Sequence, residues 1–198
     1  MHTQYKIVFA GPVGAGKTTA IQSLSDIEVV STEARASDVV RQLKSTTTVA
    51  MDYGLMKLDN GDQVRLYGAP GQKRFDFMWD ILTQHALGLV VLVSAAGAEP
   101  VGDLRQYLDA FRALIDRTAV VVGVTHTDKG DPAVRQLLIE EMHRQRIPPC
   151  VMDADARSRP DVAMLVKCLL FSIDPFAGAL LEPDAPLTIN PAWAGQGL

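Results

Sequence analysis

The residues with the clearest chemical potential are Gly11 to Thr18, which read G-P-V-G-A-G-K-T. This glycine-rich run follows an apolar, strand-like segment (residues 5–10) and precedes residues 19–24, which can form a helix. Glycines allow backbone N–H groups to close around phosphate oxygens, and a helix start adds a positive dipole end. In this pattern Lys17 reaches the β- and γ-phosphates, and the hydroxyl of Thr18 binds Mg²⁺. A glycine-rich turn that binds nothing is the alternative, but the strand–turn–helix order predicts a nucleoside triphosphate site.

The residues expected to bind the phosphates belong to this run or follow it directly: Gly11, Val13, Gly14, Ala15, Gly16, Lys17, Thr18 and Thr19. Around them, the pattern predicts an α/β domain over residues 1–180 and a Pro/Gly-rich tail over residues 181–198. The expected strands are residues 5–10, 49–58, 63–68, 87–94, 118–125 and 149–152. The expected helices are residues 19–24, 72–85, 100–115, one starting at Asp131-Pro132, and one over residues 162–173.

The order of these elements predicts the sheet. Asn60-Gly61 supplies a tight turn between two strands, so that hairpin makes its outer strand antiparallel. Strands and helices then alternate, which implies parallel pairing with right-handed crossovers. We therefore expect a six-stranded, mostly parallel sheet with one antiparallel edge strand and helices on both faces. The polar stretch over residues 25–48 is expected to be a functional loop.

The composition of the chain limits the classes of function that it could have. The chain has 198 residues and a formal net charge of −4, so it lacks the basic footprint of a nucleic-acid-binding protein. Its two cysteines, Cys150 and Cys168, lack metal-ligand spacing and are expected to be buried, reduced thiols. The longest apolar run, residues 86–98, is too short to span a bilayer, and no lipidation cysteine ends the chain. A cytoplasmic protein without a direct membrane anchor is the expectation.

Three later segments resemble sequence motifs of a known protein family. Gly68-Ala69-Pro70-Gly71-Gln72 resembles the D-x-x-G-Q segment of Ras-like small GTPases, Thr125-His126-Thr127-Asp128 their N-K-x-D motif, and Asp155-Ala156-Arg157 their S-A-K motif. All follow the glycine-rich run in the family's order, and the resemblance covers residues 5–175. The closest resemblance is to the bacterial MglA-like branch, which also has a P-G-Q segment without the usual aspartate. It implies a Ras-like P-loop fold, GTP or GDP as ligand, and slow Mg²⁺-dependent GTP hydrolysis.

The metal site departs from the family pattern, because Gly68 stands where most relatives have the aspartate that holds a water on Mg²⁺. Asp52, on the strand after the polar loop, is the candidate for a compensating carboxylate; a solvated strand residue is the equally weighted alternative. The resemblance also implies a threonine that binds Mg²⁺ and senses the γ-phosphate. Its distance from Asp52 favours Thr48, with Thr47 close behind. Thr18, Thr48 and Asp52 are therefore the expected metal ligands.

The resemblance assigns the base-binding residues. Asp128 should accept hydrogen bonds from the N1 and N2 groups of guanine, a donor pair that adenine lacks, and the Ala156 N–H should contact O6. Thr125 and His126 replace the family's asparagine and lysine, and an imidazole can still stack on a purine. Asp155 and Arg157 complete the set of expected contacts. GTP is favoured over ATP.

The resemblance also assigns catalysis. Gln72 would orient the attacking water, with Lys17 and Gly71 at the phosphates. Gln72 as a solvent-facing residue at a helix start is the alternative. No arginine is assigned to stabilise the developing charge, because Arg35, Arg41 and Arg74 all lie away from the family's position. Slow turnover that needs a partner protein is therefore expected.

A partner surface is predicted on the helix after Gln72. Phe75, Met78, Trp79 and Leu82 share its core-facing side, whereas Phe77 and Ile81 lie on the opposite side. That apolar pair suggests a docking site for a regulator or effector, and coverage by the tail around Trp193 is the alternative. The resemblance implies a Roadblock-type regulator. Two other functions remain open: a P-loop ATPase or kinase, and a nucleotide-binding scaffold that does not hydrolyse.

Overall fold

The structure, a computed structural model, describes residues 4–31, 51–58, 61–71 and 77–173. Their strands are β1 (Gln4–Ala10), β2 (Val30–Ser31), β3 (Asp52–Lys57), β4 (Gln63–Gly68), β5 (Gly88–Ser94), β6 (Val120–Thr125) and β7 (Val151–Asp153). Their helices are α1 (Lys17–Leu24), α3 (Phe77–Thr83), α4 (Pro100–Ala110), α5 (Arg112–Ile115), α6 (Val134–Arg144) and α7 (Arg159–Ile173). Some residues named in the predictions lie outside these ranges: Thr48, Gln72, Phe75, Arg35, Arg41, Arg74 and the tail.

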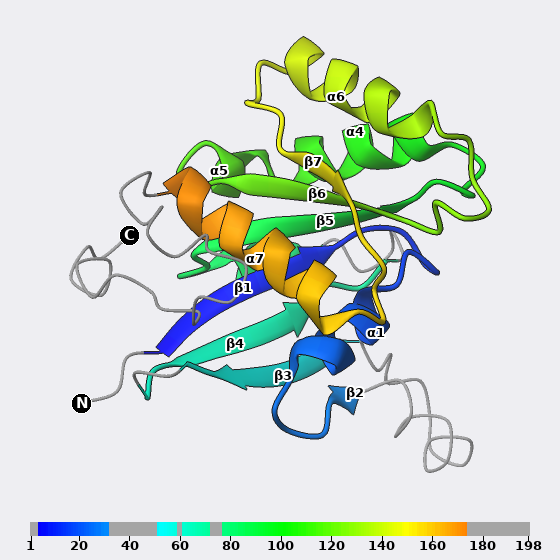
Figure 1. The fold of residues 1–198 in the computed structure, drawn as a ribbon. Coiled ribbons are helices and arrows are strands. Elements are labelled where there is room, and N and C mark those ends of the chain that lie inside the picture. Colours follow the sequence, from blue (N-terminus) through cyan, green and yellow to red (C-terminus); the bar gives the residue numbers. More distant parts are fainter. Residues whose placement is uncertain (1–3, 32–50, 59–60, 72–76, 174–198) are drawn as a thin grey trace, which may run out of the picture.

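The described strands form one sheet in the order β2-β3-β4-β1-β5-β6-β7 (Figure 1). Strands β4, β1, β5, β6 and β7 are parallel, and β3 is antiparallel to β4, as the hairpin predicts. The predicted mixed α/β sheet is confirmed, but it has seven strands in the described part of the chain rather than six. The addition is β2, where Val30 and Ser31 pair with Tyr53 and Asp52. Two residues are too few to produce a period-2 pattern, so the sequence gives no signal for this strand.

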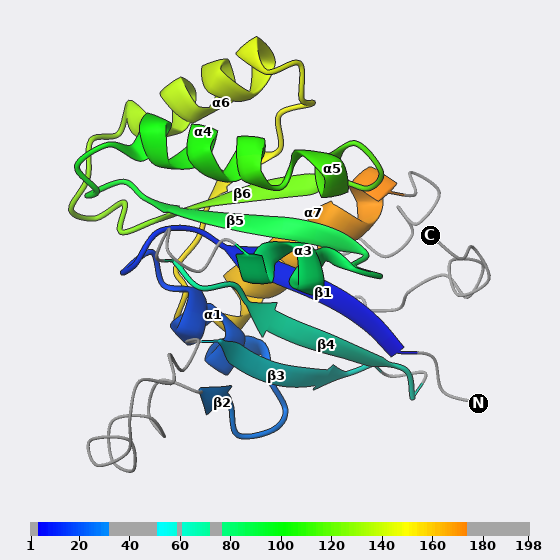
Figure 2. The same ribbon diagram turned by 180° about the vertical axis from the view of Figure 1, so that it is seen from behind.

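The two faces of the sheet are covered by different helices. Helices α1 and α7 lie over one face (Figure 1), and α3, α4, α5 and α6 lie over the other (Figure 2). Strands β5 and β6 are almost entirely buried along their length, which explains their continuous apolar sequences. The carboxyl ends of the parallel strands, where ligands bind in open α/β sheets, are therefore held by a core on each face.

The helix predicted over residues 100–115 is divided in two. Phe111 leaves the helical region of backbone space, with φ −99° and ψ 15°, and separates α4 from α5. Its ring is buried and stacks on Trp79 at 5.1 Å between ring centroids. The apolar stripe continues across this break, so its periodicity could not reveal it.

Two smaller predictions also need correction. Helix α6 begins at Val134 rather than at Pro132 with Asp131 as its cap, although the Asp131 carboxylate accepts a hydrogen bond from the Ala133 N–H at 2.8 Å. Cys150 and Cys168 are half-buried rather than buried, because they pack at the margin of the core beneath α1 and α7. In the described ranges, no helix combines the length and the hydropathy that crossing a bilayer requires.

Candidate nucleotide-binding site

The glycine-rich run forms the loop between β1 and α1, and its glycines are required by the backbone. Gly11, Gly14 and Gly16 have φ values of 136°, 81° and 95°, in the region that side chains disfavour. A Cβ on Gly11 would lie 2.1 Å from the Leu92 carbonyl oxygen of β5. A Cβ on Gly16 would lie 3.0 Å from the Cβ of Ala156. The loop is thus seated tightly between the neighbouring strand and the segment after β7.

The loop exposes a set of N–H groups without acceptors. Among the described residues, the N–H groups of Val13, Gly14, Gly16, Thr18 and Thr19 donate to no protein oxygen, whereas that of Ala15 donates to Pro12 at 3.2 Å. Gly16 caps α1 without a side-chain hydrogen bond, and the first turn holds no acidic residue. Several converging N–H groups at a helix start form a concave anion site.

Lys17 lies inside this loop. Its ammonium group donates to the carbonyl oxygens of Gly11 at 2.7 Å and Pro12 at 2.8 Å. Gly71, at the end of the segment after β4, packs closely against the same region, because a Cβ on it would lie 2.9 Å from the Lys17 Nζ. The lysine is therefore held where the loop and the Gly71 segment meet, the position that a terminal phosphate would require.

Asp52 lies beside the loop on β3. The hydroxyl of Thr18 donates to the Asp52 Oδ2 at 2.5 Å, and Asp52 is 8% exposed, so the solvated alternative is wrong. Asp52 is also paired directly with Gly68 in the β3–β4 register. A Cβ on Gly68 would lie 3.1 Å from the Asp52 Oδ2. The Asp52 carboxylate thus occupies the space where a side chain at position 68 would begin.

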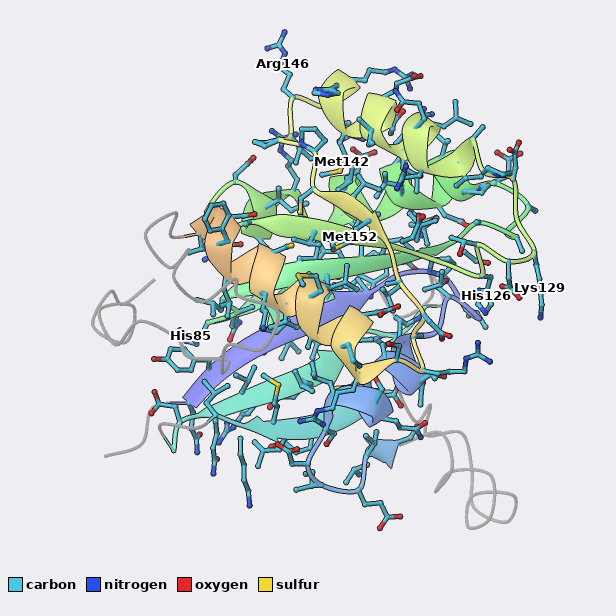
Figure 3. All side chains as sticks on the ribbon, viewed as in Figure 1. His85, His126, Lys129, Met142, Arg146 and Met152 are labelled. Carbon is cyan, nitrogen blue, oxygen red and sulfur yellow. The ribbon has the colours of Figure 1, made fainter. Side chains whose placement is uncertain are left out.

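The loop after β6 carries Thr125, His126 and Asp128. Thr125 is 2% exposed, and its hydroxyl donates to the Ala15 carbonyl at 3.0 Å, which ties this loop to the glycine-rich run. His126 has a φ of 54° although it ends no helix, and its Nδ1 lies 3.1 Å from the Ser94 hydroxyl. Figure 3 shows His126 and Lys129 together at this end of the sheet, far from His85 at the other end. Thr125 therefore positions the loop, while His126 and Asp128 are exposed.

The loop after β7 presents one N–H group without an acceptor. The N–H groups of Ala154, Asp155 and Arg157 donate to Val124, Asp161 and Asp155, respectively. That of Ala156, between them, donates to no acceptor in the described part of the chain. The Arg157 guanidinium donates three hydrogen bonds to the Asp155 carboxylate, of 2.9, 3.2 and 2.8 Å. Together with the Arg157 N–H, it lowers the pKa of Asp155 to about 2.

These segments enclose one cavity of about 500 Å³. It is lined by Gly16 and Thr19 at the start of α1, by residues 125–129, and by residues 153–157 with Asp161. The structure thus brings the predicted loop together with the Thr125–Asp128 segment and the Asp155–Arg157 segment, both of which lie more than 100 residues after it in sequence. No group of three or more His, Cys, Asp or Glu residues able to hold a metal ion occurs among the described side chains.

Some residues of the site were not predicted from the sequence. Ser94 and Asp161 contact the predicted residues His126 and Asp155, and Asp153 lines the cavity. Ser94 and Asp153 are the last residues of strands β5 and β7. Their position at the carboxyl ends of parallel strands is the one sequence-level clue that could have found them.

Comparison with known proteins gives a family and a fold. A family model described as "Conserved hypothetical ATP binding protein" matches residues 25–146, more than half of the chain. An uncharacterized protein of Methanocaldococcus jannaschii is 33% identical over 95 residues, which are 48% of this chain and 54% of that protein. The chain thus spans about half the length of this curated relative. The structure resembles that of a bacterial selenocysteine-specific elongation factor, EF-Sec, with a TM-score of 0.63 and 21% identity over 88% of this chain and 30% of the other.

Proposed function

The chain belongs to the family of conserved hypothetical ATP-binding proteins, and we propose that this member is a GTP-binding switch that hydrolyses GTP slowly with Mg²⁺. Nucleotide binding follows from the family and the P-loop fold. Our proposal adds that the base is guanine, that Mg²⁺ is bound, that the nucleotide is hydrolysed, and that a partner protein regulates the reaction. The observation that carries it is the cavity beside the loop, which is lined by both Asp128 and Ala156. The Ala156 N–H has no acceptor among the residues that the structure describes.

The base is proposed to be guanine because its edge complements these two groups. Guanine presents two adjacent donors, N1–H and the N2 amino group, and one acceptor, O6. The Asp128 carboxylate can accept from both donors, and the Ala156 N–H can donate to O6. Adenine presents an amino donor where guanine has O6 and an acceptor where guanine has N1–H, so both groups would be mismatched. An unpaired polar group facing a ligand discriminates strongly against the analogue that cannot satisfy it.

The phosphates are proposed to lie on the free N–H groups of the loop, with Lys17 at the β- and γ-phosphates. The hydroxyl of Thr18 and the carboxylate of Asp52 are oxygen ligands of the kind Mg²⁺ prefers, and Mg²⁺ is usually bound through one or two carboxylates together with substrate phosphates and water. The residues present therefore fit the ion. When bound, Mg²⁺ neutralises charge on the phosphate oxygens. Thr48, outside the described residues, is the proposed third ligand.

Hydrolysis is proposed to be slow and to depend on a partner. Gln72, which follows Gly71 and lies outside the described residues, would orient the attacking water. A Roadblock-type regulator or another activating protein would dock on α3, where Ile81 is 57% exposed. No nucleic-acid partner and no direct membrane anchor are proposed. We also propose a cytoplasmic location.

Asp128→Asn tests the base assignment. An asparagine donates where the carboxylate accepts, so affinity for GTP should fall about 100-fold and affinity for xanthosine triphosphate should rise, because hydrogen bonds to charged groups contribute about 1.5–3 kcal/mol each. Asp131→Asn, on the same loop but outside the cavity, is the matched control. Unchanged GTP affinity in Asp128→Asn would refute the guanine assignment.

ATP is the competing ligand, because the family description names it. Single-turnover assays with radiolabelled GTP and ATP decide between these nucleotides and also between a switch and a scaffold. Release of phosphate from GTP alone supports the proposal. Release from ATP supports a P-loop ATPase, and no release from either nucleotide supports a scaffold.

A further inference from the structure

A buried aromatic cluster joins α3 to α4 beneath the segment after β4. It consists of Trp79, Tyr107 and Phe111, each at most 6% exposed. The Trp79 ring lies 5.5 Å from that of Tyr107 and 5.1 Å from that of Phe111, between ring centroids. Mutual packing of three large, buried rings restricts their movement, because protein interiors are close-packed.

Two members of this cluster hold the backbone of Pro70 and Gly71. The Trp79 Nε1 donates to the Pro70 carbonyl at 3.3 Å, and the Tyr107 hydroxyl donates to the Gly71 carbonyl at 3.1 Å. Burial and the neighbouring Asp103 raise the pKa of Tyr107, so its hydroxyl stays protonated and remains a donor. The consecutive peptide groups on either side of the Gly71 Cα are thus each anchored by one aromatic side chain.

The opposite side of Gly71 faces the glycine-rich loop. A Cβ on Gly71 would lie 2.8 Å from the Val13 nitrogen, 2.9 Å from the Lys17 Nζ and 3.0 Å from the Gly11 carbonyl oxygen. In a trans peptide the carbonyl and the N–H point in opposite directions, so an anchored Pro70 carbonyl directs the Gly71 N–H away from Trp79. That N–H donates to no acceptor in the part of the chain that the structure describes.

We propose that Trp79 and Tyr107 are positioning residues, which hold the Gly71 N–H against the phosphate loop so that it donates to the terminal phosphate of a bound nucleoside triphosphate. The aromatic cluster then couples that phosphate to the packing of α3 against α4. This inference rests on the proposed binding of a triphosphate in the loop and is independent of which base is bound. A diphosphate has no oxygen at that position, so the anchor should matter for the triphosphate alone.

Tyr107→Phe tests the inference, because it removes one hydroxyl and keeps the ring in the core. We expect the affinity for a non-hydrolysable GTP analogue to fall about 2- to 10-fold, the range for one neutral hydrogen bond, while the affinity for GDP stays unchanged. Trp79→Phe should act in the same direction. Tyr5→Phe is the matched control, since Tyr5 is also buried but lies at the amino end of β1.

Tryptophan fluorescence supplies a second readout. The chain has two tryptophans, so in a Trp193→Phe background the emission reports Trp79 alone. We expect the GTP analogue to change this emission and GDP to leave it close to that of the nucleotide-free protein. Adding Tyr107→Phe should reduce the change.

Two results would overturn the inference. The first is an equal loss of affinity for GDP and for the GTP analogue in Tyr107→Phe, which would indicate a purely structural role. The second is an unaltered affinity for the analogue in both Tyr107→Phe and Trp79→Phe. Failure of the proposed function looks different, because the unmodified protein would then bind neither GDP nor the analogue.

Discussion

Replacing Asp52 by asparagine probes the proposed magnesium site. The Asp52 carboxylate is buried, accepts the Thr18 hydroxyl at 2.5 Å and lies opposite Gly68 in the sheet. Asparagine keeps the shape of the side chain and removes its charge. A hydrogen bond to a charged group contributes about 1.5–3 kcal/mol and a neutral one about 0.5–1.5 kcal/mol, so the loss should be about 1–1.5 kcal/mol. Because 1.4 kcal/mol is a factor of ten, the Mg²⁺ concentration for half-maximal GTP binding should rise roughly 5- to 12-fold.

The assay is a titration of Mg²⁺ into protein and fluorescent GTP, followed by anisotropy. Asp62→Asn is the control, since Asp62 is equally buried but lies at the other end of the β3–β4 hairpin. An unchanged Mg²⁺ requirement in Asp52→Asn would refute the assignment.

A rescue experiment sharpens this prediction. Gly68→Asp alone should weaken binding, because its Cβ would lie 3.0 Å from the Cβ of Asp52. In the Asp52→Ala background that space is open, and an aspartate at position 68 would return a carboxylate to the same place. We therefore expect the double variant to bind GTP with a lower Mg²⁺ requirement than Asp52→Ala alone. If it binds no better than Asp52→Ala, the two positions are not equivalent.

Two further predictions concern stability and thiol chemistry. Glu141 on α6 is 1% exposed and is paired with Arg105 and Arg144. Glu141→Ala should lower Tm by roughly 5 °C at pH 7. The pairing with Arg105 lowers the Glu141 pKa, so the stability that this pairing contributes is complete above the ordinary carboxyl range and is lost as pH falls through the lowered pKa. The difference in Tm between the variant and the unmodified protein should therefore shrink as the pH falls below the ordinary carboxyl range, and a constant difference would contradict this. A hydrogen bond from Cys150 lowers the Cys168 pKa to about 7, so Cys150→Ala should move the midpoint of iodoacetamide alkylation at Cys168 upward by about two pH units, and an unmoved midpoint would count against this pairing.

Much of the fold could be predicted because its signals are local. The Asn-Gly turn, the continuous apolar strands and the glycine-rich run each specify their own conformation within a few residues. The misses are features set by contacts distant in sequence. Strand β2 exists because Val30 pairs with Tyr53, and the break at Phe111 accompanies stacking on Trp79.

The site shows the same division between local and distant information. The sequence supplied the candidate Asp52 because a carboxylate was missing at Gly68, but only the strand register places the two side by side. Thr125 was predicted to contact the nucleotide. In the structure its hydroxyl also donates a hydrogen bond to the Ala15 carbonyl, which connects its loop to the glycine-rich run. The anchors Trp79 and Tyr107 act through backbone carbonyls, which leave no pattern in the sequence.

The most direct test of the proposed function is a titration of the purified, nucleotide-free protein with fluorescent GTP, GDP and ATP, each with and without Mg²⁺. The proposal predicts tight binding of both guanine nucleotides, weak binding of ATP, and a gain in GTP affinity when Mg²⁺ is added. Binding of ATP as tight as that of GTP, or tighter, would contradict the guanine assignment of Asp128 and Ala156 and would favour a P-loop ATPase.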